Sequence, residues 1–293
     1  MRPVRDVCLI VNPSAGGGRA AVRLPAVELA LRERGVRFRV ERTTSIEHAR
    51  ALARETLETG EIAAAMGGDG LTGAVAGELR GTAGVLAVIP GGRGNDFARK
   101  LEIPGDPVAA CDLLVDGVER AVDVADVGGR TYVGIMSAGF DSDVQAIANS
   151  TRLDLGMFVY VYGTLMAMRT WRPARWEVTL DGATRSFDGY SVAVANSGVF
   201  GGGMRLAPEA SVQDGVLDVV LIEAASKLRY LRNLPRVFSG RHVDEPMLTI
   251  EQAREISFTA DRPFTAYADG DPIAELPATV RVLPGALRVL VAR

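Results

Sequence analysis

The strongest constraint on the fold is an alternation of two hydrophobic periods across the first hundred residues. Four short apolar runs have the length of buried strands: 7–11, 36–41, 62–66 and 84–89. Segments with a helical period lie between and after them: 19–34, 44–59, 71–79 and a segment that begins at 95. Strands that alternate with helices predict a parallel sheet with helices on both faces. We therefore expect an N-terminal α/β domain.

Local residues predict where these helices begin and end. Gly35 and Gly60 follow two of the helical segments and predict their C-terminal ends. Thr44 and Glu47 have the spacing of a capping box, which places the start of the second helix there.

After Ala121 the residue pattern changes, and the segments that follow are typical of β-strands. Apolar alternation on either side of Asp181-Gly182 predicts a hairpin. A Pro284-Gly285 turn is expected to separate two last strands. Helical segments interrupt this part at about 141–171 and at 226–240, and the second has one face with three leucines: Leu228, Leu231 and Leu234. The pattern predicts a second, mainly antiparallel domain, which we expect to be a β-sandwich.

Length and composition agree with two soluble domains. The 293 residues exceed the ~250 at which single cores usually stop growing, and we place the boundary near 125. A net charge of -3 without clustered basic residues argues against a nucleic-acid partner. Cys8 and Cys111 are expected to be reduced core residues. The N-terminus lacks a cleavable signal pattern, and the apolar run 155–168 is shorter than the ~18 residues of a membrane span, so we expect a cytoplasmic protein.

Three glycine-rich loops follow predicted strands: NPSAGGGR at 12–19, GGDGLTG at 67–73 and PGGRGNDFAR at 90–99. Ligands collect at the carboxyl ends of parallel strands. Glycine lets backbone N–H groups approach a phosphate, and a following helix adds its positive end. One such loop is often only a tight connection, but three at equivalent positions predict a polyphosphate site. None matches the P-loop or the dinucleotide motif.

Five motifs follow the order and spacing of the bacterial diacylglycerol kinase family, which shares its catalytic domain with sphingosine and ceramide kinases: NPSAGGG, GGDG, PGGRGNDFAR, GGGMRLAPEASVQDGVLDV and ADGD. The resemblance covers about 7–291. It implies an ATP-binding α/β domain at 1–125, a lipid-binding β-sandwich at 126–280, and a last segment, about 281–293, that packs back on the first domain. It also implies an active site in the cleft, with ATP and Mg²⁺.

The resemblance further implies roles for single residues. Gly67, Gly68, Asp69 and Gly70 match a loop that binds ATP phosphates, with an essential aspartate; the residues alone also allow an aspartate tolerated in a strained turn. The other implied nucleotide contacts are Asn12, Gly16, Thr43, Asn95, Asp96 and Arg99. Asp123 matches an aspartate that organises water and metal. The implied Mg²⁺ site consists of the Asp214 carboxylate and the carbonyls of Ser211 and Val216.

The sequence departs from the family pattern at three positions. Leu71 stands where the family has threonine, and Thr72 is a candidate to supply that hydroxyl from the next position. Arg93 also replaces a threonine; it either holds phosphate or points to solvent. Asp271 occupies the place of the glutamate taken as the base that deprotonates the lipid hydroxyl. Because aspartate is one methylene shorter, either the cleft closes further or the activity is low.

The resemblance implies a lipid kinase that transfers the γ-phosphoryl group of ATP to a diacylglycerol-like or sphingoid lipid. An NAD kinase-like enzyme, which also carries GGDG, and a nucleotide- or lipid-binding protein without catalysis remain alternatives. The segment MFVYVYGTLMAM at 157–168 is either a core helix or a border of the lipid pocket. We expect only transient, peripheral membrane contact, and a homodimer is one of the oligomeric states that the sequence allows. His48 and His242 are expected at surface or capping positions.

Overall fold

A computed structural model describes residues 6–151 and 158–293, which form two compact units. The first unit consists of Met1–Val124, Thr131–Val133 and Pro284–Arg293. The second consists of Ala125–Arg130 and Gly134–Leu283. Each unit contains its own buried apolar side chains.

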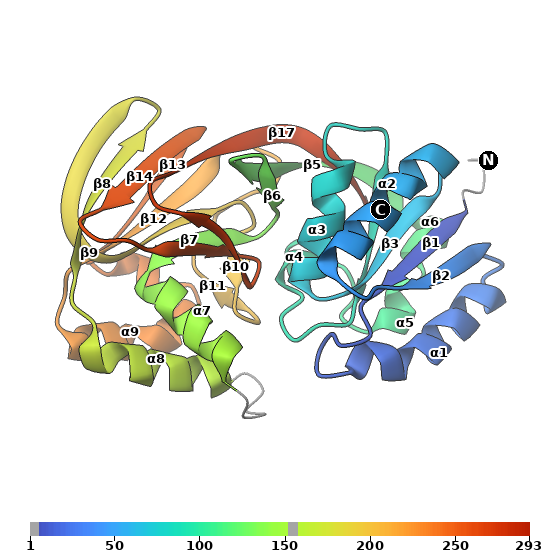
Figure 1. Ribbon diagram of the computed structural model, residues 1–293, viewed down its shortest axis with the longest axis horizontal. Helices are drawn as coiled ribbons and strands as arrows, with labels where there is room; N and C mark the ends of the chain where they lie inside the picture. The colour runs from blue at the N-terminus through green and yellow to red at the C-terminus, as the bar shows by residue number, and fades with distance from the viewer. Residues whose placement is uncertain (1–5, 152–157) are drawn as a thin grey trace. The chain divides into compact units, whose positions relative to one another are not determined.

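The first unit contains the predicted parallel sheet, with neighbouring strands in the order β4, β3, β1, β2 (Figure 1). The strand bounds are β1 Val7–Val11, β2 Phe38–Arg42, β3 Ile62–Gly67 and β4 Val85–Pro90. Every residue of β1, β3 and β4 is buried, as expected for strands covered on both faces. In register, Val7 of β1 lies between Phe38 and Ile62.

The helices of the first unit cover both faces of this sheet, which confirms the predicted α/β class. The bounds are α1 Arg19–Glu33, α2 Ile46–Thr59, α3 Asp69–Leu79, α4 Asp96–Lys100, α5 Pro107–Ala110 and α6 Leu113–Asp116. Helices α2 and α3 pack against each other, and α1 packs against α5. Right-handed crossovers between parallel strands place α2 and α3 on one face and α1 on the other.

The predicted start of α2 was wrong by one residue. Ser45, not Thr44, is the N-cap, because its hydroxyl accepts the His48 N–H at 3.1 Å. The predicted end is confirmed, since Gly60 adopts a φ of 73° that favours glycine.

The second unit is the predicted antiparallel β-sandwich. Its strands, two of which begin or end in the first unit, are β5 Val118–Val127, β6 Arg130–Tyr132, β7 Ile135–Gly139, β8 Ala174–Leu180, β9 Ala183–Ala195, β10 Val199–Phe200, β11 Met204–Arg205, β12 Leu217–Glu223, β13 Leu248–Ala253, β14 Glu255–Ala260, β15 Thr265–Ala268 and β16 Asp271–Glu275. The long strand β9 pairs with β8 through its first half and with β7 and β12 through its second. Asp181 and Gly182 have φ values of 46° and 89°, so the predicted hairpin between β8 and β9 is confirmed.

The predicted turn at Pro284-Gly285 is wrong. A single strand, β17 (Ala278–Val291), runs through this dipeptide, and Gly285 with a φ of 59° absorbs the irregularity. The first part of β17 pairs with β14, and Arg288 and Val289 pair with Val85 and Leu86 of β4.

Among its described residues, the second unit contains three helices and a short 3₁₀ helix: α7 Phe140–Ser150, α8 Phe158–Thr170, α9 Lys227–Val237 and η1 Arg241–Asp244. The predicted helical segment 141–171 contains α7 and α8, and its residues 152–157 lie outside the described part. The three leucines of α9 do not share one buried face: Leu228 is 69% exposed, and the buried residues of this helix are Tyr230 and Val237. Cys8 and Cys111 are buried free thiols, as expected. Among the described residues, no helix combines the length and apolarity needed to cross a bilayer.

Candidate active site

The three glycine loops meet at the carboxyl ends of β1, β3 and β4. The N–H groups of Gly91 and Gly92 both donate to the Gly67 carbonyl, at 2.8 and 3.0 Å. A Cβ on Gly92 would lie 2.4 Å from the Gly68 Cα, and one on Gly16 would lie 2.7 Å from the Gly91 carbonyl oxygen. Side chains would therefore force these loops apart. Glycine is required for their close approach.

Arg19, which the sequence analysis assigned to no role, links two of these loops. Its Nε donates to the Gly16 carbonyl at 3.0 Å, and its Nη2 donates to the Gly92 carbonyl at the same distance. Arg19 is the first residue of α1, so it places a positive charge beside the positive end of that helix. The available signal was its position directly after the glycine run GGG.

Asp69 connects the second loop to the third. It is the first residue of α3, and its Oδ1 accepts the Phe97 N–H at 3.1 Å. Desolvation raises the pKa of Asp69, while hydrogen bonds from the amides of Phe97, Asp96 and Asn95 oppose the shift. Asp69 has no positive φ, so its position is explained by these amides and not by a strained turn. A Cβ on Gly94 would lie 2.9 Å from the Asp96 Oδ2 and 3.0 Å from the Asp69 Oδ2, so a larger residue there would displace these carboxylates.

The third loop is folded on itself by side chains that the sequence predicted to bind nucleotide. Asn95 adopts a φ of 53°; its Oδ1 accepts the Gly92 N–H at 2.9 Å. Asp96 is buried, and the exposed Arg99 donates to the Gly94 carbonyl at 3.1 Å. Arg93 is also exposed on this loop. The third loop therefore carries two exposed guanidinium groups, those of Arg93 and Arg99.

Asn12 and Thr43 lie beside the first loop. The Asn12 Oδ1 accepts the Ser14 N–H at 3.1 Å, and the Thr43 hydroxyl donates to the Val11 carbonyl at 3.2 Å. Thr72 is buried within α3 and donates to the Gly68 carbonyl at 3.2 Å, so its hydroxyl is engaged by its own helix. Asp123 is buried in β5, where its Oδ1 accepts the Gly285 N–H at 2.7 Å and joins β5 to β17.

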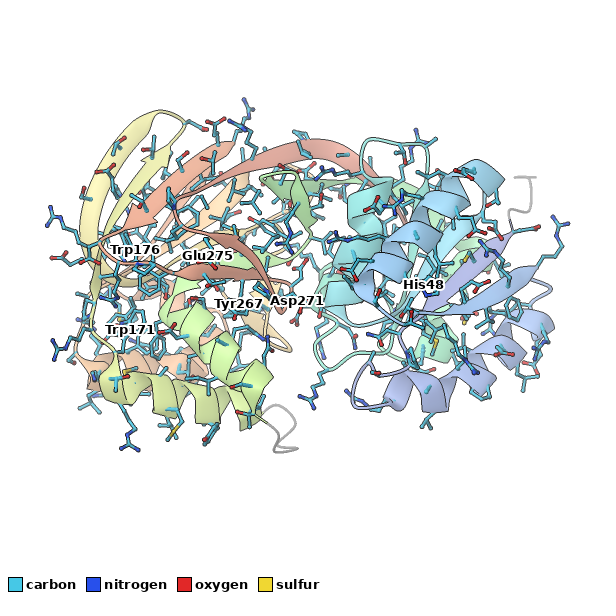
Figure 2. All side chains as sticks on the ribbon, in the orientation of Figure 1. His48, Trp171, Trp176, Tyr267, Asp271 and Glu275 are labelled. Atoms are coloured by element: carbon cyan, nitrogen blue, oxygen red, sulfur yellow. The ribbon has the colours of Figure 1, made fainter. Side chains whose placement is uncertain are left out.

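Asp271 begins the second strand of a hairpin in the other unit. Asp269 and Gly270, with φ values of 53° and 96°, form its two-residue turn. The Asp269 Oδ1 accepts the Gly134 N–H at 2.9 Å, and Asn149 of α7 donates to the Gly270 carbonyl at 2.9 Å. Figure 2 shows Asp271 and Tyr267 on this hairpin, where Asp271 pairs with Ala268. The turn that carries Asp271 is thus fixed on two sides.

The surroundings of Asp271 favour its protonated form. Partial desolvation raises the pKa of Asp271 above its ordinary value, although the residue stays accessible to solvent. The charge of Arg130 partly opposes this shift. Arg130 also holds β16, since it donates to the carbonyls of Ile273 and Pro272 at 2.7 and 3.1 Å.

The predicted metal ligands lie on a turn before β12. Asp214 is exposed, and its Oδ1 accepts the Val216 N–H at 3.2 Å. The Ser211 hydroxyl accepts the Gln213 N–H at 3.2 Å within the same turn. No cluster of three or more His, Cys, Asp or Glu side chains with metal-binding geometry occurs in 6–151 and 158–293. The predicted Mg²⁺ site differs from such a cluster, because it consists of one carboxylate and two backbone carbonyls.

An apolar pocket that is open to solvent lies within the second unit. Helices α7, α8 and α9 and the segment around β10, β11 and η1 supply its walls, including Phe140, Val161, Phe200, Leu234 and Met247. Its few polar groups include Asp141, whose Oδ1 accepts the Tyr230 hydroxyl at 3.2 Å. Burial raises the pKa values of both Asp141 and Tyr230, which favours a neutral pair.

His242 also lines this pocket, so its predicted surface or capping position is wrong. It is 3% exposed, and its Nε2 lies 3.0 Å from the Leu206 carbonyl oxygen. Burial lowers the pKa of His242. His48 lies in the first turn of α2, where its Nδ1 is 3.3 Å from the Thr44 hydroxyl, but the cap of this helix is Ser45.

Comparisons with known proteins cover the whole chain. Residues 6–127 match the family model described as the diacylglycerol kinase catalytic domain, and residues 134–291 match the YegS C-terminal NAD kinase beta sandwich-like domain. A diacylglycerol kinase of Mycobacterium tuberculosis is 33% identical over 296 residues, which cover 98% of this chain and 95% of the relative. A protein named probable lipid kinase YegS-like, of Pseudomonas aeruginosa, is 30% identical over 290 residues, with coverages of 97% and 94%.

The chain belongs to the bacterial diacylglycerol kinase family of lipid kinases. A crystal structure of a diacylglycerol kinase from Bacillus anthracis agrees in fold, with a TM-score of 0.76, 20% identity and coverage of 99% of this chain and 98% of that one. The resemblance read from the five motifs is therefore confirmed. The kinase-type catalytic domain of the family coincides with the stretch that carries the three glycine loops.

The structure shows the surroundings of two residues that depart from the family's motifs. Leu71 is buried, and its Cδ2 would lie 2.7 Å from a Cβ on Gly67, so it packs under the second loop. Arg93 lies exposed on the third loop. Leu71 therefore adds apolar packing below the loops, and Arg93 adds charge at their surface.

Proposed function

We propose that the chain is an ATP- and Mg²⁺-dependent lipid kinase that phosphorylates a hydroxyl group of a diacylglycerol-like or sphingoid lipid. The observation that carries the proposal is the meeting of three glycine loops around Gly67, Gly91 and Gly92. Backbone N–H groups and a helix N-terminus suit a polyphosphate. The apolar pocket supports a lipid as the acceptor.

The loops supply the parts that phosphoryl transfer needs from a protein, which are positioning and charge neutralisation. Arg19 links the first loop to the third, because it donates hydrogen bonds to one backbone carbonyl of each. Asp69 holds the second loop to the third through the Phe97 amide. Arg93 and Arg99 are exposed on the third loop and are our candidates for holding phosphate oxygens.

The turn at 211–216 offers oxygen donors, which suit a hard divalent ion. Asp214 is exposed, and oxygen donors from one carboxylate and backbone carbonyls match the ligands that Mg²⁺ prefers. Asp214 with the carbonyls of Ser211 and Val216 would hold the ion. A bound Mg²⁺ would neutralise phosphate charge.

Asp271 is our candidate for the proton acceptor. A general base works best when its pKa lies near the operating pH, and desolvation moves the pKa of Asp271 in that direction. The anchored turn at Asp269 and Gly270 fixes the backbone from which the shorter aspartate side chain extends. Asp123 stays our candidate for organising water near the reaction.

The apolar pocket separates the lipid kinase from the NAD kinase-like alternative. Its walls are mainly aliphatic and aromatic. Of the two carboxyl groups that line it, Asp141 is held in an environment that favours the neutral form, and Glu245 is paired with Arg229 and Arg236. An acyl chain matches such walls, whereas a dinucleotide requires charged and polar partners.

The direct test is transfer of radiolabelled γ-phosphate from ATP with Mg²⁺, offered dioleoylglycerol, sphingosine and NAD⁺ in parallel. We expect label in a lipid and none in NAD⁺, and we expect Asp69→Ala to abolish the transfer. Label in NAD⁺ alone would establish the alternative enzyme. Bound ATP with no labelled acceptor would instead indicate a binding protein without catalysis.

A further inference from the structure

Exposed apolar side chains concentrate on one part of the second unit. Of the nine large hydrophobic residues that are exposed in 6–151 and 158–293, six belong to α8, to η1, or to α9 and the residue after it. They are Val161 (48%), Tyr162 (37%), Leu165 (52%), Leu228 (69%), Phe238 (48%) and Val243 (36%). A grouping of this kind marks an interaction surface, whereas single exposed residues do not.

Helices α8 and α9 lie side by side, so these residues come from adjoining elements. The Lys227 Nζ at the start of α9 donates to the Met168 carbonyl near the end of α8 at 2.6 Å. Both helices also wall the same apolar pocket, and Figure 1 shows them together at one edge of the second unit. On α8, Val161 and Leu165 are one turn apart and therefore share a face.

Helix α9 has three faces of different character. Its inner face carries Tyr230, Leu234 and Val237, which contact the pocket. Arg229, Arg232 and Arg236 are spaced three and four residues apart and line one shallow groove along the helix. Between these two faces runs an outer apolar stripe of Leu228, Leu231, Pro235 and Phe238. An apolar stripe with arginines beside it is typical of a helix that lies in a membrane interface.

The charge of α9 opposes that of the whole chain. The chain has a net charge of -3, yet residues 227–241 contain one lysine and four arginines and no acidic residue. Glu245 pairs with Arg229 at 3.1 Å and with Arg236. The segment nevertheless keeps an excess of positive charge. Each basic residue near an anionic leaflet contributes about 1 kcal/mol of attraction.

The apolar pocket reaches the surface among these residues. Val161 and Phe238 belong both to its walls and to the exposed apolar set. An acyl chain at this position would pass from a bilayer into the pocket along apolar side chains. The exposed set and the pocket therefore form one continuous apolar path.

We propose that the α8–α9 surface, which consists of the exposed residues Val161, Tyr162, Leu165, Leu228, Phe238 and Val243 with the α9 arginines, docks on an anionic lipid bilayer. The inference rests on the proposed lipid kinase function and names the surface through which that enzyme meets its substrate. Excess positive charge selects the bilayer over an uncharged protein partner. It also disfavours a second copy, since like-charged helices would meet.

Vesicle co-sedimentation without ATP or diacylglycerol tests the proposal. We expect the wild-type chain to bind vesicles of phosphatidylcholine with phosphatidylglycerol and to bind pure phosphatidylcholine vesicles at least about tenfold more weakly. The double variant Leu165→Gln with Leu228→Gln should bind the anionic vesicles at least about tenfold more weakly than wild type. A matched variant, Val22→Gln with Leu29→Gln on α1, should bind like wild type, because those residues are also exposed but lie elsewhere.

The outcomes separate the docking surface from the catalytic function. Vesicle binding by wild type without phosphate transfer to any lipid would support the surface and contradict the kinase. Transfer to a water-soluble short-chain diacylglycerol without vesicle binding would overturn the surface and leave the kinase. Equal binding by both double variants would also overturn it. A wild-type dimer that the Leu165 and Leu228 changes dissociate, without vesicle binding, would assign the surface to a second copy.

Discussion

At the scale of single residues, the geometry gives Asp69 a contact that the sequence could not show. The GGDG motif marks the residue as important, but its partner, the Phe97 amide, lies 28 positions further along the chain. The same holds for Arg19, whose carbonyl partner Gly92 is 73 positions away. Motifs identify chemical groups, whereas only the fold reveals which distant backbone atoms they bind.

Replacing Asp69 with Asn tests whether its charge or its hydrogen bond matters. Asparagine keeps an oxygen for the Phe97 N–H, so we expect a thermal midpoint close to wild type. The rate of phosphate transfer should fall about 100-fold or more, as is typical when a preorganised polar group is lost from such a site. Circular dichroism and the transfer assay measure the two effects. An unchanged rate would remove the Asp69 charge from the mechanism.

The acidic side of the pH–rate profile tests Asp271. A base must be deprotonated to act, so the rate should fall as the pH drops through its pKa, and desolvation moves that fall above the ordinary aspartate range. Arg130 lowers the pKa of Asp271. Arg130→Gln should therefore move the acidic fall to higher pH. A profile that stays in place, in a variant that remains folded, would argue against Asp271 as the base.

His242 should make the second unit less stable in acid. Burial lowers the pKa of His242 in the folded chain. As the pH falls below about 6.5, the unfolded chain therefore binds a proton at this residue while the folded chain stays neutral there. Stability from this residue is present above the unfolded pKa and is lost as the pH falls. His242→Gln should flatten the loss of thermal midpoint between pH 7 and about pH 5. An unaltered slope would contradict the assignment.

At the scale of elements, the loops depend on glycine for their contact with one another. A Cβ on Gly92 would meet the Gly68 Cα at 2.4 Å, whereas a Cβ on Gly105 would meet nothing within 4 Å, and neither glycine has a positive φ. Gly92→Ala should therefore weaken ATP binding about tenfold or more, since misplaced groups in such sites have effects of that size or larger. Gly105→Ala is the matched control. Calorimetric titration with ATP makes the comparison, and equal affinities would contradict the role of loop contact.

The sequence predicted most elements of the fold and missed those that depend on tertiary contacts. The apolar run of β1 was sufficient to predict that strand, and Gly60 was sufficient to predict the end of α2, because both features are encoded by neighbouring residues. The Pro284-Gly285 dipeptide favours a turn locally, yet pairing with β14 and β4 keeps β17 extended through it. In α9 the leucine spacing predicted one apolar face, but the pocket selected Tyr230 and Val237 for burial.

At the scale of the whole molecule, the two units can be followed separately. Trp171 and Trp176, the two tryptophans of the chain, both belong to the second unit (Figure 2). The ring centroid of each lies within 6 Å of that of Phe264. Tryptophan fluorescence therefore reports the second unit, while the ATP binding that we propose for the glycine loops would report the first. Length and composition indicated two domains, and the family resemblance implied that the last segment, about 281–293, packs back on the first. Only the strand pairing shows that one continuous strand, β17, contributes to both units.

Buried leucines in each unit test this division. Leu287→Ala in β17 and Leu221→Ala in β12 each remove a fully buried side chain, at a cost of about 2–5 kcal/mol. In urea, Leu287→Ala should lower the midpoint for ATP binding and leave the tryptophan transition in place, and Leu221→Ala should shift the tryptophan transition. Coincident shifts of both signals in both variants would show instead that the chain unfolds as one cooperative body.

The most direct measurement of the central claim is the fate of the ATP phosphate in the presence of the wild-type chain, Mg²⁺ and dioleoylglycerol, followed by phosphorus NMR. We predict a phosphomonoester signal in the lipid fraction that grows in step with ADP. A parallel sample contains sphingosine in place of dioleoylglycerol. If both samples yield only ADP with inorganic phosphate, or leave ATP unchanged at ATP concentrations that saturate binding, the assignment of this chain as a lipid kinase is contradicted.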